Sequence, residues 1–401
     1  MENTERAKVR WVDIVPTTHN GMEMFLIRDP EGLAGDSLLV SRDVLFLISL
    51  MDGRKTVLDI QEAYMRAAGG ALVPFDRIIS VIETMDAQFL LQNDRYERHV
   101  AALKDAYAAL SCRTAFLPGR SYPDDEAGLR AFMAGLLRQG QAPAGKDHVK
   151  GIIAPHIDYG RGADVYRRAY RFLPVDENTL FVIFGTCHKP APRVWNIALR
   201  DLRTPLGTVK GAAEVGRLLR EDALLGTYVD EWPHRNEHSI ELQLPIIQSL
   251  LGHGRFEVLS ILTGSFHEYM EAGRSPSFGE AAELAERLKE ILKAHEGPCV
   301  VIAGADLAHI GAQFGDPPPL DASTLEESRQ KDGALLETVA RMDAAGFFEA
   351  VRGEGDRRRI CGLAPIYFLL SMLGPCGGEV VGYDQWTDGA SSVSFAGVVF
   401  S

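Results

Sequence analysis

The sequence predicts an α/β protein in which helices cover both faces of a sheet. A small winged-helix-like domain precedes this α/β domain in the sequence. Strand-like apolar runs alternate with amphipathic segments from about residue 149 onward, as is typical of a sheet packed on both faces. Helical apolar stripes dominate about the first 100 residues instead. The length of 401 residues suits one large domain with a smaller partner.

The composition indicates which kinds of partner and which cellular location to expect. The formal net charge of −13 disfavours nucleic acid, because phosphate neutralisation needs clustered cations. The start, MENTERAKVR, leads into no secretory signal, and no apolar run approaches a membrane span. We therefore expect a cytoplasmic protein without a membrane partner. The five cysteines are widely spaced and form no CxxC pair, which disfavours a disulfide framework.

Caps and periodicity predict three helices and a wing in the N-terminal region. Ser41 precedes the first apolar stripe, and Thr56 with Asp59 forms a capping box before the second. After the third stripe, a polar turn at Asn93 and Asp94 follows an apolar run, which predicts a small β wing.

The expected domains are a winged-helix-like domain over 1–97, a helical connector over 98–111 and an α/β domain over 112–401. The third predicted helix offers only Arg77 as a cation, so DNA binding is disfavoured. The stretches LMDGRKTVLDI and DRIISVIETMDAQFLL resemble small peptide-chaperone domains of pyrroloquinoline-quinone biosynthesis. That resemblance implies a peptide partner, and a docking or stabilising module is the alternative.

Polar side chains follow several strands of the predicted sheet. The strand-like runs are VKGIIAP, TLFVIFG, FEVLSILTG, PCVVIAG, GGEVVGY and SVSFAGVVF. The polar residues after them are His156, Asp158 and Tyr159, then Cys187 and His188, then Asp306 and His309. A loop adds Cys361, and a predicted helix adds Glu237, His238 and Glu241. Open α/β sheets bind ligands at the carboxyl ends of their strands, so we expect a site there.

The residue types in these clusters favour a mononuclear metal site. One histidine after a strand is more often structural, but two of them with a cysteine and a polar pair match a site with open positions. Imidazole and thiolate suit iron, copper or zinc, whereas calcium and magnesium prefer oxygen. Alternation points Cys187 away from His188, so we interpret Cys187 as a core residue.

Two clusters leave alternatives open. Asp158, next to Tyr159, is either an acceptor that orients a ligand histidine or a solvated loop carboxylate. His238 and Glu241 stand at i,i+3 on the predicted helix. They are either a pair that lines the pocket or an ion pair and cap at the helix start. We expect all four residues to contact substrate.

Ordered motifs carry a family resemblance. RTAFLPGRSYP, APH-x-x-Y, G-x-x-H, EHSIE-x-x-LP, D-x-x-H and ICG-x-x-PI occur in this order from about residue 112 to the end. They resemble the Memo family, also called protein B of the AmmeMemoRadiSam system, although the first motif has PHIDY where the family often has PHAGY. The resemblance implies the fold of class III extradiol dioxygenases, with a cysteine in place of their ligand carboxylate.

Carried onto this chain, the resemblance implies that His156, His188 and Cys361 hold the metal. It implies that Asp306 and His309 are catalytic neighbours of the open coordination positions, with His309 as the acid/base. The expected ion is iron, with copper and zinc as alternatives. A thiolate ligand favours softer ions, so ring cleavage itself is in doubt.

We expect a dioxygenase-like oxidoreductase whose substrate the sequence does not name. The alternative is a non-catalytic protein that binds a peptide or a small molecule. The family name implies radical-SAM and AMMECR-type proteins as partners, and the N-terminal domain favours a peptide. Metal-dependent hydrolysis, with Asp306 or Glu237 as the base, is a third hypothesis, and the identity of the metal separates it from redox chemistry.

Overall fold

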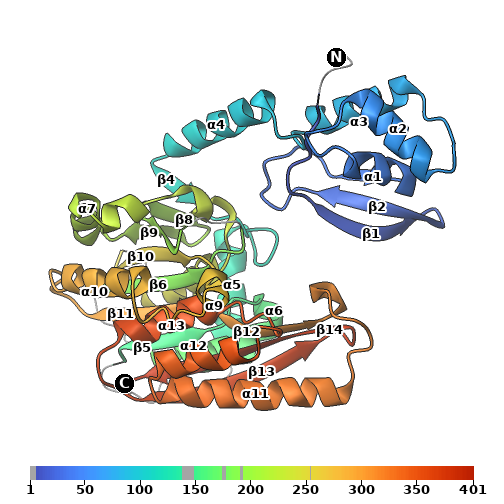
Figure 1. The fold of residues 1–401 in the computed structure, drawn as a ribbon. Coiled ribbons are helices and arrows are strands. Elements are labelled where there is room, and N and C mark those ends of the chain that lie inside the picture. Colours follow the sequence, from blue (N-terminus) through green and yellow to red (C-terminus); the bar gives the residue numbers. More distant parts are fainter. Residues whose placement is uncertain (1–5, 138–148, 174–177, 190–192, 253) are drawn as a thin grey trace. The chain divides into compact units, whose positions relative to one another are not determined.

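The computed structural model describes residues 6–137, 149–173, 178–189, 193–252 and 254–401. The chain divides into two compact units, residues 1–109 and residues 110–401, and the first is drawn in blue and cyan in Figure 1. Within the described residues, no helix combines the length and the apolar character that crossing a bilayer demands.

The first unit packs helices on a small antiparallel sheet. Its elements are β1 (Asp13–His19), β2 (Met22–Arg28), β3 (Leu38–Val40), α1 (Arg42–Ser49), α2 (Val57–Ala67), α3 (Phe75–Ala87) and α4 (Asp94–Ala108). The predicted caps are formed. Ser41 accepts a hydrogen bond from the backbone of Val44, and Thr56 and Asp59 cap each other's backbone N–H groups. The apolar faces of α1, α2 and α3 meet around the fully buried Ile27.

The wing predicted after the third helix is not formed. The side chain of Asn93 accepts a hydrogen bond from the backbone N–H of Tyr96 at 3.0 Å, so it caps α4. The hairpin is formed by β1 and β2, which are joined by Asn20 and Gly21 with φ of 50° and 75°. Asn-Gly is a favoured hairpin turn because both positions need a left-handed backbone. A polar Asn suits a turn and a helix cap equally, and here it makes the cap.

The second unit is built on an 11-stranded sheet. The strands are β4 (Cys112–Thr114), β5 (Gly151–Ala154), β6 (Thr179–Thr186), β7 (Trp195–Ala198), β8 (Asp201–Thr204), β9 (Gly207–Gly211), β10 (Phe256–Thr263), β11 (Cys299–Gly304), β12 (Asp306–Gly311), β13 (Gly378–Thr387) and β14 (Ser391–Phe400). Their order is β12-β14-β5-β11-β6-β10-β9-β8-β4, with β13 beside β14 and β7 beside β10. Because β5, β11, β6 and β10 are parallel, their carboxyl ends meet at one edge.

Helices cover both faces of this sheet, as predicted (Figure 1). One face packs on α5 (Glu126–Leu137), α6 (Tyr159–Tyr170) and α8 (Leu244–Leu251). The other packs on α7 (Ala213–Glu221), α10 (Glu280–Leu292), α11 (Ala322–Ala340), α12 (Ala344–Gly353) and α13 (Leu363–Met372). Within β6, Val182 and Phe184 join the second core, whereas Phe181 and Ile183 join the first. The strand is therefore apolar on both sides.

The buried carboxylate of Glu241 fastens the segment after β4 to the start of α8. It accepts hydrogen bonds from the backbone N–H groups of Phe116 at 2.7 Å and Leu117 at 2.8 Å. The hydroxyl of Tyr122 donates to it at 2.7 Å, and the guanidinium of Arg113 lies 3.2 Å away. A buried charge is costly unless such partners surround it, so this network makes the docking of the segment specific.

Replacing Glu241 by Gln is expected to lower the free energy of unfolding by about 3 kcal/mol, because the amide accepts fewer hydrogen bonds and leaves the buried Arg113 without a countercharge. Urea denaturation followed by tryptophan fluorescence measures the change. Glu337→Gln is the matched control, since that side chain is 75% exposed, and it should cost less than about 1 kcal/mol. Equal unfolding midpoints for Glu241→Gln and the wild type would contradict this role.

Candidate metal centre

His156 lies just beyond β5 and is held through its ring and its backbone. Nδ1 lies 2.8 Å from the carbonyl oxygen of Gly304, at the end of β11. A carbonyl only accepts, so Nδ1 carries the proton and Nε2 keeps a free lone pair. The backbone N–H of His156 donates to Asp306 at 2.9 Å. Burial, helped by the neighbouring His188, lowers the pKa of His156 well below its usual value, so the ring stays neutral as ligation requires.

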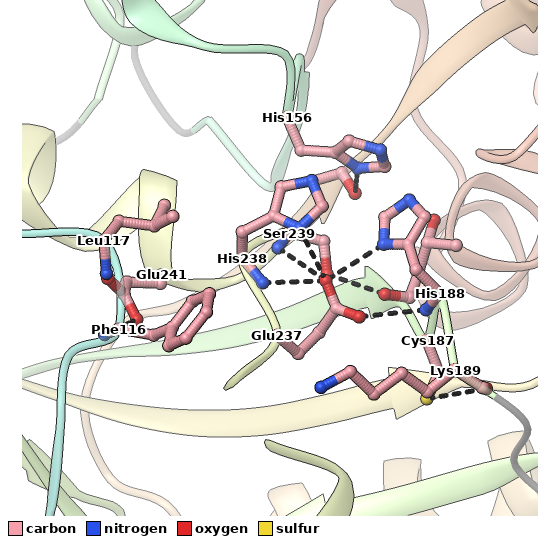
Figure 2. Close-up of polar contacts among 12 residues, drawn as sticks. Phe116, Leu117, His156, Cys187, His188, Lys189, Glu237, His238, Ser239 and Glu241 are labelled. Carbon is pink, nitrogen blue, oxygen red and sulfur yellow. Dashed lines mark hydrogen bonds and ion pairs between the residues drawn. The ribbon is translucent and has the colours of Figure 1, made fainter. Parts of the chain in front are cut away.

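His188 lies just beyond β6 and is oriented by the buried Glu237. The carboxylate lies 3.0 Å from Nδ1 of His188 and accepts its backbone N–H at 2.9 Å (Figure 2). It also accepts the backbone N–H groups of His238 at 2.7 Å and Ser239 at 3.2 Å. Burial opposes ionisation, but His188 and His238 outweigh it and hold the pKa of Glu237 well below its usual value. An ionised carboxylate behind an imidazole fixes its tautomer and its direction.

Cys361 enters from the segment between α12 and α13. Its carbonyl accepts a hydrogen bond from Thr186 at 2.9 Å, and the next backbone N–H, of Gly362, donates to the carbonyl of Asp306 at 3.0 Å. Glycine is needed there, because a Cβ would lie 2.3 Å from that carbonyl oxygen. Burial, together with the Asp306 carboxylate, raises the pKa of the Cys361 thiol well above its usual value. A thiolate at this position therefore needs a cation beside it.

The structure brings the three predicted ligands together. Sγ of Cys361 lies 3.3 Å from Nε2 of His156, and the ligand atoms of these two residues and His188 all lie within 4.8 Å of one another. Nitrogen and sulfur ligands about 2.1 and 2.3 Å from one ion stand roughly 3.1–3.6 Å apart, so the spacing fits a shared ion. Two neutral imidazoles and a thiolate suit iron, copper or zinc.

His238 adds a third imidazole to the cluster. Its ring stacks on that of His188, with centroids 4.6 Å apart, and its centroid lies 5.4 Å from that of His156. Nδ1 of His238 lies 3.1 Å from Glu237. Burial lowers the pKa of His238, but the hydrogen bond to Glu237 and the negative charges of Glu237, Asp306 and Glu241 together outweigh burial and raise the pKa overall. His188, Glu237 and His238 form a second group whose ligand atoms lie within 4.8 Å of one another.

Asp306 and His309 lie on strand β12, which pairs with β14 across a register shift. The Asp306 carboxylate lies 3.7 Å from Nε2 of His156, and burial raises its pKa to about 7. His309 is half-buried, with Nδ1 3.1 Å from the carbonyl of Leu307, and burial lowers its pKa to about 4. Asp306 therefore lies beside His156, one of the predicted ligands. His309 is a neutral imidazole close enough to His188 for that residue to affect its pKa.

Asp158, Tyr159 and Glu241, expected to contact substrate, occupy positions in the framework. Asp158 caps α6 by accepting the backbone N–H of Arg161 at 3.2 Å. Tyr159 is fully buried and donates its hydroxyl to the carbonyl of Leu242. Glu241 is fully buried and points toward the segment after β4 (Figure 2). The groups that orient the ligand rings are instead the carbonyl of Gly304 and the carboxylate of Glu237.

The helix predicted around His238 is not formed either. His238 lies between the 3-10 turns η2 (Trp232–Asn236) and η3 (Glu241–Gln243), and α8 begins only at Leu244. Pro245 explains the late start, since proline favours the first turn of a helix. Helical i,i+3 spacing therefore does not apply to this segment. The sequence predicted Glu237 only as a possible base. Its role in orienting His188 was missed, and the one sequence feature that could have indicated it is the position of Glu237 directly before His238.

Comparisons with known proteins identify the family of this chain. A family model described as Memo-like protein matches residues 113–399. A MEMO1 family protein of Aquifex aeolicus (strain VF5) is 27% identical over 403 residues, which cover 98% of this chain and 100% of the relative. A MEMO1 family protein of Thermus thermophilus is 29% identical over 342 residues, or 83% of this chain and 94% of the relative. The family predicted from the ordered motifs is confirmed, and the chain belongs to the Memo-like protein family.

Proposed function

We propose that this protein is an oxidoreductase that uses one non-heme iron ion held by His156, His188 and Cys361. The observation that carries the proposal is the convergence of their ligand atoms within 4.8 Å from three separate segments. Each imidazole also has its other nitrogen engaged, by Gly304 and Glu237. Three protein ligands leave coordination positions open, as catalytic sites do, whereas structural zinc sites use four.

The donor set favours redox chemistry over hydrolysis. A bound iron or copper ion would supply Lewis acidity and electron transfer, and a soft thiolate ligand selects iron, copper or zinc over hard ions such as magnesium. Glu237 is a poor hydrolytic base, because its oxygens already accept N–H groups of His188, His238 and Ser239. His156 is only 2% exposed, whereas His188 is exposed, so the three proposed ligands extend from the interior of the protein to its surface.

Asp306 and His309 are the residues that we assign to proton transfer. A pKa of about 7 lets the Asp306 carboxyl hold or release a proton near neutral pH. His309 is neutral there, because burial lowers its pKa to about 4, and the carbonyl of Leu307 holds its ring. We assign His238, whose pKa is raised beside Glu237, to binding an anionic part of the substrate.

The Cys361→Ser protein is expected to retain less than about a tenth of the iron of the wild type after anaerobic reconstitution, because a hydroxyl replaces the thiolate poorly. Metal analysis after desalting measures the occupancy. Cys187→Ser is the control, since that side chain packs against the apolar core with Sγ 3.5 Å from the carbonyl of Lys189. Equal iron in Cys361→Ser and the wild type would refute the ligand assignment, and preferential retention of zinc would refute the redox assignment.

Glu237→Gln should weaken metal binding by roughly 10–100-fold, because His188 loses the charge that orients it. Competition with a chelator gives the affinities. Asp158→Asn is the matched control, because Asn caps a helix as well as Asp and Asp158 contacts Arg161 at 3.2 Å, not the ligand rings. An unchanged affinity in Glu237→Gln, or an equal loss in both variants, would overturn this role of Glu237.

The affinity for the ion is expected to rise at least about tenfold per pH unit from about pH 6 to 8, since binding releases at least the thiol proton of one ligand. The proton comes from Cys361, whose thiol pKa burial raises well above the usual value. His156 contributes none, because its lowered pKa leaves it neutral already. Chelator competition across this range provides the measurement, and an affinity independent of pH would argue against a thiolate ligand.

A further inference from the structure

We propose that the second unit has a separate binding site for a small aromatic anion, in which Arg193 and Arg274 hold the anionic group. The site is a cavity of about 920 Å³ beside β7 and the segments on either side of α9 (His267–Glu271). His156, His188 and Cys361 do not line it. It lies beyond the carboxyl end of β10, an edge where α/β sheets place ligands.

Arg193 is fixed at the end of the sheet by its backbone. The N–H of Gly264 donates to the carbonyl of Val194 at 2.9 Å, and a Cβ on Gly264 would lie 2.3 Å from the carbonyl oxygen of Arg193. The guanidinium donates one hydrogen bond, to the carbonyl of Thr227. In the described part of the chain it meets no carboxylate at ion-pair distance, so its other donors are available to a ligand.

Arg274 reaches the same cavity from the turn after α9. Its backbone N–H donates to the carbonyl of Tyr269 at 2.9 Å, and the turn is tied to α13 through Ser277, 3.0 Å from the hydroxyl of Tyr367. Among the described residues, no carboxylate forms an ion pair with this guanidinium. Two arginines that line one cavity and form no ion pair among the described residues suit a carboxylate or phosphate, which arginine binds through two parallel N–H groups.

Two carboxylates share the cavity with the two arginines. Glu280 accepts a hydrogen bond from the hydroxyl of Tyr228 but keeps its negative charge, because the hydroxyl is neutral. Glu268 also lines the cavity. These two carboxylates repel a second anionic group, so the ligand carries its charge on the one group that the arginines contact.

Aromatic side chains line the same cavity and indicate the rest of the ligand. Phe278 is 79% exposed, and Tyr228 and Tyr269 contribute further ring surface. A ligand ring would cover the Phe278 side chain and gain from aromatic contact. The geometry therefore favours an aryl phosphate or an aryl carboxylate over an inorganic anion.

Calorimetric titration of the metal-free, full-length protein with phenyl phosphate tests the site, and phenylacetate tests the carboxylate form of the ligand. We expect binding by the wild type, and at least a tenfold weaker affinity in both Arg193→Gln and Arg274→Gln. Arg220→Gln, on the exposed side of α7, is the matched control and should bind as the wild type does. Phe278→Ala should weaken phenyl phosphate more than inorganic phosphate.

No binding of either probe by the wild type, or equal binding by Arg274→Gln and the wild type, would overturn the proposal. Thermal melting curves of the arginine variants should match that of the wild type, because neither guanidinium supports the fold through an ion pair among the described residues. Cys361→Ser should bind the probe unchanged. The outcome is thus independent of whether the proposed metal chemistry is correct.

Discussion

The candidate centre depends on one buried charge, the carboxylate of Glu237. A carboxylate removed from water is costly unless hydrogen bonds and opposite charges surround it. Here the backbone N–H groups of His188, His238 and Ser239 converge on it, and the ring of His188 lies 3.0 Å away. The requirement to satisfy this charge fixes the backbone that carries one proposed ligand and the direction of its ring. The framework of the protein thus orients His188 in advance.

The parallel centre of the sheet explains how the other parts meet. Because β11 lies between β5 and β6, His156 and His188 emerge on either side of its end. At the end of β11, the carbonyl of Gly304 accepts a hydrogen bond from the ring of His156. Any side chain at residue 304 would collide with the backbone, because its Cβ would lie 2.3 Å from the carbonyl oxygen of Ser239. Cys361, 205 residues beyond His156, reaches the same edge from the segment before α13. Close backbone packing therefore sets the separation of the ligand atoms.

Sequence patterns predicted the features that local chemistry determines, and missed those that depend on distant contacts. The apolar runs are strands of the sheet, and ordered motifs identified a ligand set whose atoms converge. Asn93 suits a turn and a cap equally, so its role could not be separated in advance. Tyr159 and Glu241 neighbour the proposed site residues along the chain, but segments far away in sequence enclose both of them. Helical spacing also misplaced His238, because 3-10 turns interrupt that segment.

Whether Cys361 and the two imidazoles share one ion is decided most directly by X-ray absorption at the metal edge of the iron-loaded, full-length protein. The convergence of Sγ and Nε2 to 3.3 Å predicts one sulfur neighbour at about 2.3 Å together with nitrogen or oxygen neighbours at about 2.0–2.2 Å. A first shell made only of nitrogen and oxygen, in protein that binds one ion per chain, would contradict the assignment of Cys361 as a ligand.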